Sequence, residues 1–140
     1  MIRRAVLAMM LVPASSLAAQ VAPVPDADNP TRQSVRYVSG EQVLLTALPN
    51  VPMTVLLDPA DPVMEIETGD VQGWTVEAVP SRDGVILSPS PDARPGSLVV
   101  RTRERLYAFD IRTGENLSSA VLVRFEYGDT SIEAVAPRWS

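Results

Sequence analysis

The side chains that most often carry out chemistry are scarce in this chain. Of its 140 residues none is Cys and none is His, and all 12 of its positively charged residues are Arg. Without His, the usual general base at neutral pH and the commonest metal ligand are missing. Without Cys there is no thiolate nucleophile and no disulfide. Glycine-rich phosphate loops and the G-x-S-x-G nucleophile turn are also absent from the sequence. We therefore expect a protein that is not an enzyme, with no catalytic residue, no cofactor and no metal.

Five carboxylates gather in a short stretch of the chain. They are Asp58, Asp61, Glu65, Glu67 and Asp70. A calcium ion needs roughly six to eight converging oxygens. Here prolines at positions 59 and 62 fix a turn, and the two glutamates alternate with apolar residues along a predicted strand. We interpret the stretch as a solvated acidic face.

Three arginines surround a predicted hairpin tip. Arg101, Arg103 and Arg105 alternate along the chain, with Glu104 among them. Arginine suits bidentate pairing with carboxylates, so the three are candidate interface residues toward an acidic neighbour. The other interpretation is a solvated hairpin paired with the protein's own acids. We favour the second, because exposed ion pairs contribute only about 0–1 kcal/mol and are common.

Short runs typical of β-strands fill the chain after residue 33, broken by Pro, Gly, Asp and Asn. Turns recurring every ~8–12 residues are typical of a β-sandwich or barrel. We predict an all-β fold, a single β-sandwich of eight or nine short, mostly antiparallel strands. The expected strands are 34–38, 42–47, 53–57, 63–68, 74–79, 85–88, 98–102, 105–111 and 120–127.

Large aromatic residues are few, at 5% of the chain, and they follow the apolar alternation of these runs. Each could line a ligand site, but they lie on the same side of their strands as Val and Ile, which favours burial. We expect Trp74, Tyr107, Phe109 and Phe125 to be core anchors. Tyr127, at the end of its strand, is expected to be partly exposed.

The N-terminus has the order of an export signal. Arg3 and Arg4 precede an apolar run over 5–12, and small residues follow up to Ala19. This pattern predicts a cleavable signal peptide over 1–19 and a periplasmic location. Cleavage would leave ten arginines against 17 acids, which argues against direct nucleic acid binding. The apolar run is too short to span a bilayer, so no membrane insertion of its own is expected.

The remaining boundaries follow from composition. Residues 20–33 are rich in Pro and Asp, which predicts an extended linker, or an arm that pairs with a neighbouring subunit. The β-sandwich is expected over 34–128. Residues 129–140 are expected to form a short C-terminal tail.

The order of motifs resembles the N-terminal domain of the TrbG/CagX family of type IV secretion and conjugation subunits. No single motif is specific, but the ordered series covers the chain from about Val35 to Tyr127. It comprises V-R-Y at 35–37, an acidic proline turn at 58–62, Gly69-Asp70, Trp74, L-S-P at 87–89, V-R-T at 100–102, Y-A-F at 107–109 and V-R-F-E-Y at 123–127.

The resemblance implies a periplasmic structural subunit of the ring-shaped core complex of such systems. Its implied partners are other secretion-system envelope subunits and further copies of itself, with association to the outer membrane through those partners. Family members carry a second β-domain, whose contacts cannot be carried over to this chain. The alternative is a stand-alone periplasmic β-sandwich module that binds a peptide or glycan.

Overall fold

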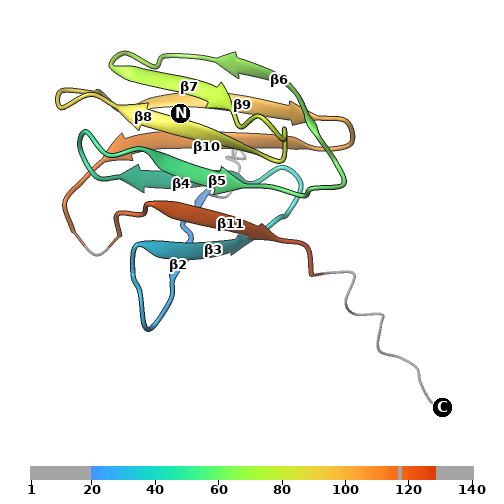
Figure 1. Ribbon diagram of the computed structural model, residues 1–140, viewed down its shortest axis with the longest axis horizontal. Helices are drawn as coiled ribbons and strands as arrows, with labels where there is room; N and C mark the ends of the chain where they lie inside the picture. Colours follow the sequence, from blue (N-terminus) through green and yellow to red (C-terminus); the bar gives the residue numbers. More distant parts are fainter. Residues whose placement is uncertain (1–19, 117, 129–140) are drawn as a thin grey trace, which may run out of the picture.

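Two β-sheets face each other in the structure, a computed structural model that describes residues 20–116 and 118–128 (Figure 1). The expected signal peptide and C-terminal tail lie outside the described residues. One sheet has the order β1 (Gln20–Val21), β4 (Gln42–Ala47), β10 (Leu106–Thr113), β9 (Gly96–Thr102) and β6 (Val63–Thr68). The other has the order β2 (Val24–Pro25), β3 (Arg32–Arg36), β11 (Leu122–Glu126), β5 (Met53–Leu56), β8 (Gly84–Pro89) and β7 (Trp74–Ala78).

The all-β sandwich prediction is confirmed, and all nine expected strands are present within a few residues of their predicted bounds. Two further strands, β1 and β2, lie in the segment that was expected to be a linker. This extended segment pairs with the domain itself: Gln20 lies beside Gln42 of β4, and Val24 lies beside Ser34 of β3. The paired part of the described chain therefore begins at Gln20.

Parallel pairing is more frequent than the sequence suggested. Among the described residues, the pairs β1–β4, β10–β4, β11–β3 and β11–β5 are parallel. The other five pairs are antiparallel. The chain repeatedly crosses between the sheets, so strands distant in sequence become neighbours.

One hydrophobic core lies between the sheets. Alternation along β11 turns Val123 and Phe125 inward and Arg124 outward, as expected for a strand with one buried face. Phe125 meets Phe109 of β10 from the opposite sheet, with ring centroids 5.9 Å apart. The core is formed largely by Val43, Leu45, Met53, Val55, Val85, Leu87, Leu98, Val100, Phe109, Ile111, Val123 and Phe125.

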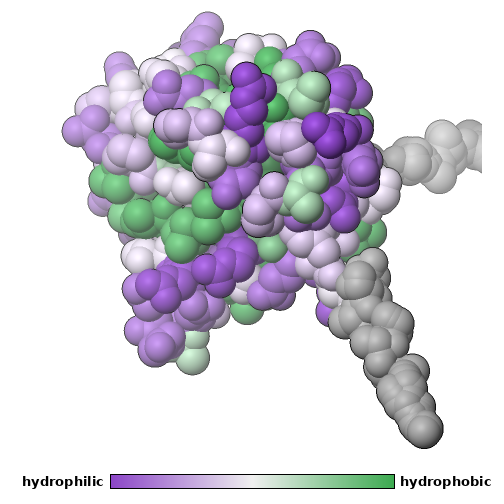
Figure 2. Space-filling model, turned by 45° about the vertical axis from the view of Figure 1, so that its right-hand side comes forward, coloured by the Kyte–Doolittle hydropathy of each residue, from purple (hydrophilic) through white to green (hydrophobic). Residues whose placement is uncertain are grey.

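One face of the molecule carries hydrophobic and hydrophilic areas side by side (Figure 2). On the face shown in Figure 2, hydrophobic surface borders strongly hydrophilic surface. Within the described residues, no helix is long and apolar enough to cross a membrane.

Candidate functional site

The four aromatic residues expected in the core are all buried. Tyr107, Phe109 and Phe125 form one chain of ring contacts, with Tyr107 and Phe125 edge to face at 5.1 Å between centroids. Trp74 lies apart from them on β7, and its indole N–H donates to the Arg94 carbonyl at 2.7 Å. These side chains serve packing, and none of them lines the groove beside the β9–β10 hairpin.

The β9–β10 hairpin carries the three arginines singled out from the sequence, and the fold separates them. Thr102 closes the hairpin through its N–H to the Arg105 carbonyl at 3.0 Å. Arg101 pairs with the protein's own acids on β6, at 3.7 Å to Glu65 and 3.5 Å to Glu67. These side chains are about half exposed, so the pairs contribute little.

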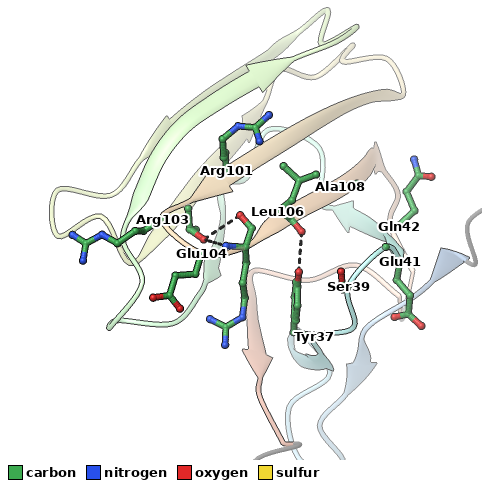
Figure 3. Close-up of a pocket in the computed structure, with 12 residues that line it drawn as sticks. Tyr37, Ser39, Glu41, Gln42, Arg101, Arg103, Glu104, Leu106 and Ala108 are labelled. Carbon is green, nitrogen blue, oxygen red and sulfur yellow. Dashed lines mark hydrogen bonds between the residues drawn. The ribbon is translucent and has the colours of Figure 1, made fainter.

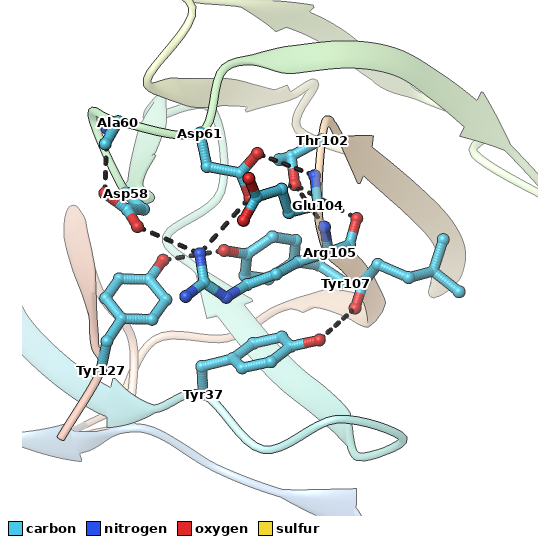
Figure 4. Close-up of polar contacts among 10 residues, drawn as sticks. Tyr37, Asp58, Ala60, Asp61, Thr102, Glu104, Arg105, Tyr107 and Tyr127 are labelled. Atoms are coloured by element: carbon cyan, nitrogen blue, oxygen red, sulfur yellow. Dashed lines mark hydrogen bonds and ion pairs between the residues drawn. The ribbon is translucent and has the colours of Figure 1, made fainter. Parts of the chain in front are cut away.

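Arg103 and Arg105 leave the hairpin in different directions. The side chain of Arg103 is exposed and makes no hydrogen bond or ion pair with any described residue. Arg105 instead lies over the end of the sandwich, between carboxylates and aromatic rings (Figure 4). The three arginines therefore do not act as one group.

Asp61 is the buried centre of this cluster. Its side chain accepts the Thr102 hydroxyl at 2.6 Å and the Glu104 N–H at 2.9 Å, and Arg105 Nη1 lies 3.4 Å away. Only 2% of Asp61 is exposed. The carboxylate thus holds the hairpin tip against the loop between β5 and β6. The interpretation of a solvated acidic face was wrong for this residue, because its charge is compensated inside the fold.

Asp58 completes the carboxylate side of the cluster. One of its oxygens accepts the Ala60 N–H at 2.9 Å, which stabilises the proline turn, and the other meets Arg105 Nη1 at 3.0 Å. The D-P-A-D-P sequence signalled the turn. It carried no sign that a hairpin some 40 positions later would bury the second aspartate.

Three tyrosines form the aromatic side. The guanidinium carbon of Arg105 lies 4.5 Å from the ring centre of Tyr127 and 5.4 Å from that of Tyr37. Such stacking stabilises a cation, and more strongly as water is excluded. The hydroxyls of Tyr107 and Tyr127 are 2.8 Å apart, and Tyr37 donates to the Leu106 carbonyl at 3.2 Å. The end of β11 is thereby joined to β10 and β3.

The electrostatics of the cluster oppose acid–base chemistry near neutral pH. Burial raises the pKa of Tyr107 above its ordinary value. The pKa of Tyr127 is raised above its ordinary value, mainly by burial and next by the hydrogen bond to Tyr107. For Arg105, partial burial lowers the pKa, but the Asp58 hydrogen bond and the neighbouring charges outweigh it, and the net pKa is raised. Tyr107 and Tyr127 stay neutral and Arg105 stays charged, which suits a structural role.

An open groove of about 660 Å³ lies beside the cluster, between the hairpin and the β3–β4 loop (Figure 3). It exists because β10 pairs with β9 from Leu106 onward, but with β4 only from Ala108 onward. The start of β10 therefore projects past β4. Leu106 is 47% exposed there. The groove carries charges of both signs, with Arg101, Arg103 and Glu104 on the hairpin side and Glu41 on the opposite side (Figure 3).

The described residues contain no group of three metal-ligating side chains placed to hold an ion. The polar atoms of the Arg105 cluster bond to one another, and the groove is wide and open. The fold and the site together define an all-β domain in which the Arg105 cluster holds two sheets and a hairpin together.

Comparison with known sequences gives the family. The CagX family, described as conjugal transfer protein, matches residues 30–137, so the chain belongs to the CagX family. It is similar to the type IV secretion system protein virB9 of Brucella suis, Brucella melitensis and Brucella abortus, at 30% identity over 112 residues. The match covers 68% of this chain and 39% of each relative. The chain thus corresponds to well under half the length of these relatives, and the predicted family resemblance is confirmed.

Proposed function

We propose that this protein is a non-catalytic, periplasmic structural subunit of a type IV secretion or conjugative transfer complex. Family membership over residues 30–137 carries the proposal. It is supported by the Arg105 cluster, whose charged groups pair within the fold and in which Tyr107 and Tyr127 have raised pKa values. Its partners would be other envelope subunits and further copies of the chain, with no direct contact to nucleic acid.

Affinity capture from the native envelope tests this function. The full chain, tagged at its C-terminus and expressed at its native level, is isolated in mild detergent with its companions. We expect other type IV secretion subunits to be enriched over a control preparation that uses an unrelated exported β-protein carrying the same tag. Recovery of the monomer alone would contradict the proposal.

Export is tested on the same preparation. We infer that residues 1–19 form a cleaved signal peptide, so the periplasmic protein should begin at or next to Gln20 by intact-mass measurement. Replacing the apolar residues Leu7 and Leu11 with Arg should trap the uncleaved chain in the cytoplasm, because a signal needs an apolar central region. Retention of residues 1–19 on the exported protein would contradict the inference.

A stand-alone peptide- or glycan-binding module is the second candidate. The groove beside Leu106 favours it, since a partly apolar concave surface with a few polar groups is typical of ligand sites. This function predicts a monomer in the envelope preparation and ligand-induced shifts of Tyr37 and Leu106 signals in NMR spectra. Stable incorporation into a large complex with no such shifts would favour the structural subunit.

A further inference from the structure

The outer face of β3 and β11 carries a second arginine group that the sequence did not reveal. The two strands run side by side in parallel (Figure 1), with Leu122 beside Arg32, Arg124 beside Ser34 and Glu126 beside Arg36. The residues between them in sequence point into the core and are buried. We call the outward-facing set Arg32, Ser34, Arg36, Leu122, Arg124 and Glu126 the β3–β11 face.

Three arginines of this face are exposed, and the carboxylate of Glu126 stands on the same face opposite Arg36. Arg32, Arg36 and Arg124 make no side-chain hydrogen bond or ion pair with any described residue, in contrast to Arg101 and Arg105. On neighbouring strands, diagonal positions lie about 7–8 Å apart, so Arg124 lies within reach of both other arginines. Glu126 stands opposite Arg36, and the Asp26 N–H donates to the Arg32 carbonyl, so the local excess of positive charge is small and centres on Arg124.

Apolar side chains continue the face across the sheet. Arg124 is beside Leu56 of β5, and Thr54 of β5 lies between Leu122 and Ile86 of β8. Leu56, Leu122 and Ile86 point away from the core and are each partly exposed. Arg124 thus stands among outward apolar side chains, with Ser34 and Leu56 directly beside it on the two neighbouring strands.

We propose that the β3–β11 face binds an acidic, extended segment of a partner protein in the envelope complex. In a strand-like segment, alternate side chains point the same way, so its carboxylates can reach the arginine forks while its apolar residues pack on Leu56 and Leu122. This assignment rests on the proposed function and names the chemistry of a partner. Nucleic acid fits less well, because the apolar flank offers nothing to phosphates and the chain is acidic overall.

Binding of defined probes to the exported full-length protein tests the assignment. The first probe is a short synthetic peptide that alternates Glu with Val or Leu and carries a neutral fluorophore, followed by anisotropy. We expect saturable binding that weakens about tenfold in the Arg32→Gln, Arg124→Gln double variant. The control Arg94→Glu changes the net charge by the same two units on an exposed loop and should leave the affinity unchanged.

Each other outcome overturns the assignment. Equal weakening by Arg94→Glu would indicate a general charge effect. Equal binding of a peptide with Gln in place of Glu would remove the role of the carboxylates. Tighter binding of single-stranded oligothymidylate of matched charge would point to nucleic acid. Self-association that is lost in the double variant would point to a second copy of the chain.

Envelope capture separates this assignment from the proposed function. If the wild-type chain recovers secretion subunits and the double variant recovers one of them about tenfold less, both stand. If wild type and double variant recover the same subunits equally, the β3–β11 face is excluded while the structural function stands. If the wild type recovers none, the proposed function fails whatever the peptide result.

Discussion

Arg105 joins three parts of the sandwich end. Its guanidinium contacts Asp58 and Asp61 from the loop after β5, and it lies over Tyr37 after β3 and Tyr127 after β11. An ion pair that is largely removed from water stabilises only when its remaining groups are hydrogen-bonded, and Asp61 meets that condition through Thr102 and Glu104. This residue therefore fixes the relative position of the hairpin and the two sheets.

Replacing Arg105 with Met should lower the free energy of unfolding by about 2 kcal/mol, because Asp61 would keep its charge without its cation. Urea unfolding followed by circular dichroism measures the loss. The matched variant Arg103→Met removes an exposed arginine from the same hairpin and should change stability by less than about 0.5 kcal/mol. Equal effects of the two substitutions would show that the Arg105 contacts do not stabilise the fold.

The tyrosine pair predicts a loss of stability at alkaline pH. The pKa values of Tyr107 and Tyr127 are raised in the folded protein, while an unfolded tyrosine titrates near ~10. The unfolded chain therefore loses these protons first, so stability is fully present below about pH 10 and falls as the pH rises above it.

The double variant Tyr107→Phe, Tyr127→Phe tests this dependence. The two phenyl rings carry no ionisable hydroxyl, so the variant lacks this source of pH dependence. Between about pH 10 and 11 its stability should fall less steeply than that of the wild type, as followed by urea unfolding at each pH. Parallel pH profiles for the two proteins would contradict the role of the pair.

At the scale of elements, Gly96 at the start of β9 allows the β6–β7 turn to pack closely. A Cβ atom there would lie 1.9 Å from the Asp70 carbonyl oxygen, and Ser97 N–H donates to that same oxygen at 3.0 Å. No side chain fits without moving the backbone. The turn carries the chain from one sheet to the other, so its displacement would disturb both.

The substitution Gly96→Ala should therefore lower the free energy of unfolding by about 2–3 kcal/mol. Gly40→Ala is the comparison, since Gly40 has a φ of +87° but open space around its Cβ position. It should cost about 1 kcal/mol, the cost of the left-handed backbone alone. If chemical unfolding shows that Gly96→Ala is no worse than Gly40→Ala, the close packing at the turn is not important.

Nine strands could be predicted because each has an alternation or an apolar run bounded by turn residues. The two-residue strands β1 and β2 are too short to show such a period, and the prolines at positions 23, 25 and 30 indicate a linker. The parallel pairs also could not be predicted, since the residues of a strand do not identify the strand that lies beside it. The burial of Asp61 and the grouping of residues on the β3–β11 face could not be predicted for the same reason. Both depend on pairing between segments 40 to 90 positions apart.

The whole molecule is held together by pairing between distant parts of the chain. The central strand β11 lies between β3 and β5, with Leu122 beside both Arg32 and Thr54. In the other sheet, β10 lies beside β4 with Ala108 next to Gln42. β10 and β11 can pair only after strands that are far away in the sequence have come close to them. Local contacts, by contrast, are limited to hairpins such as β7–β8 and β9–β10.

This topology predicts slow, cooperative folding, on the order of milliseconds to seconds, because loop closure must precede the long-range pairs. Trp74 on β7 is a suitable probe, since it is buried against the edge of the core. In a Trp139→Phe background, stopped-flow refolding by Trp74 fluorescence and by far-ultraviolet circular dichroism should give the same rate. Neither β-sheet can bury its inner face without the other, so the two signals should also share one equilibrium transition. Refolding in microseconds, or burial of Trp74 well before the circular dichroism change, would mean that one sheet forms independently of the β10–β4 and β11–β3 pairs.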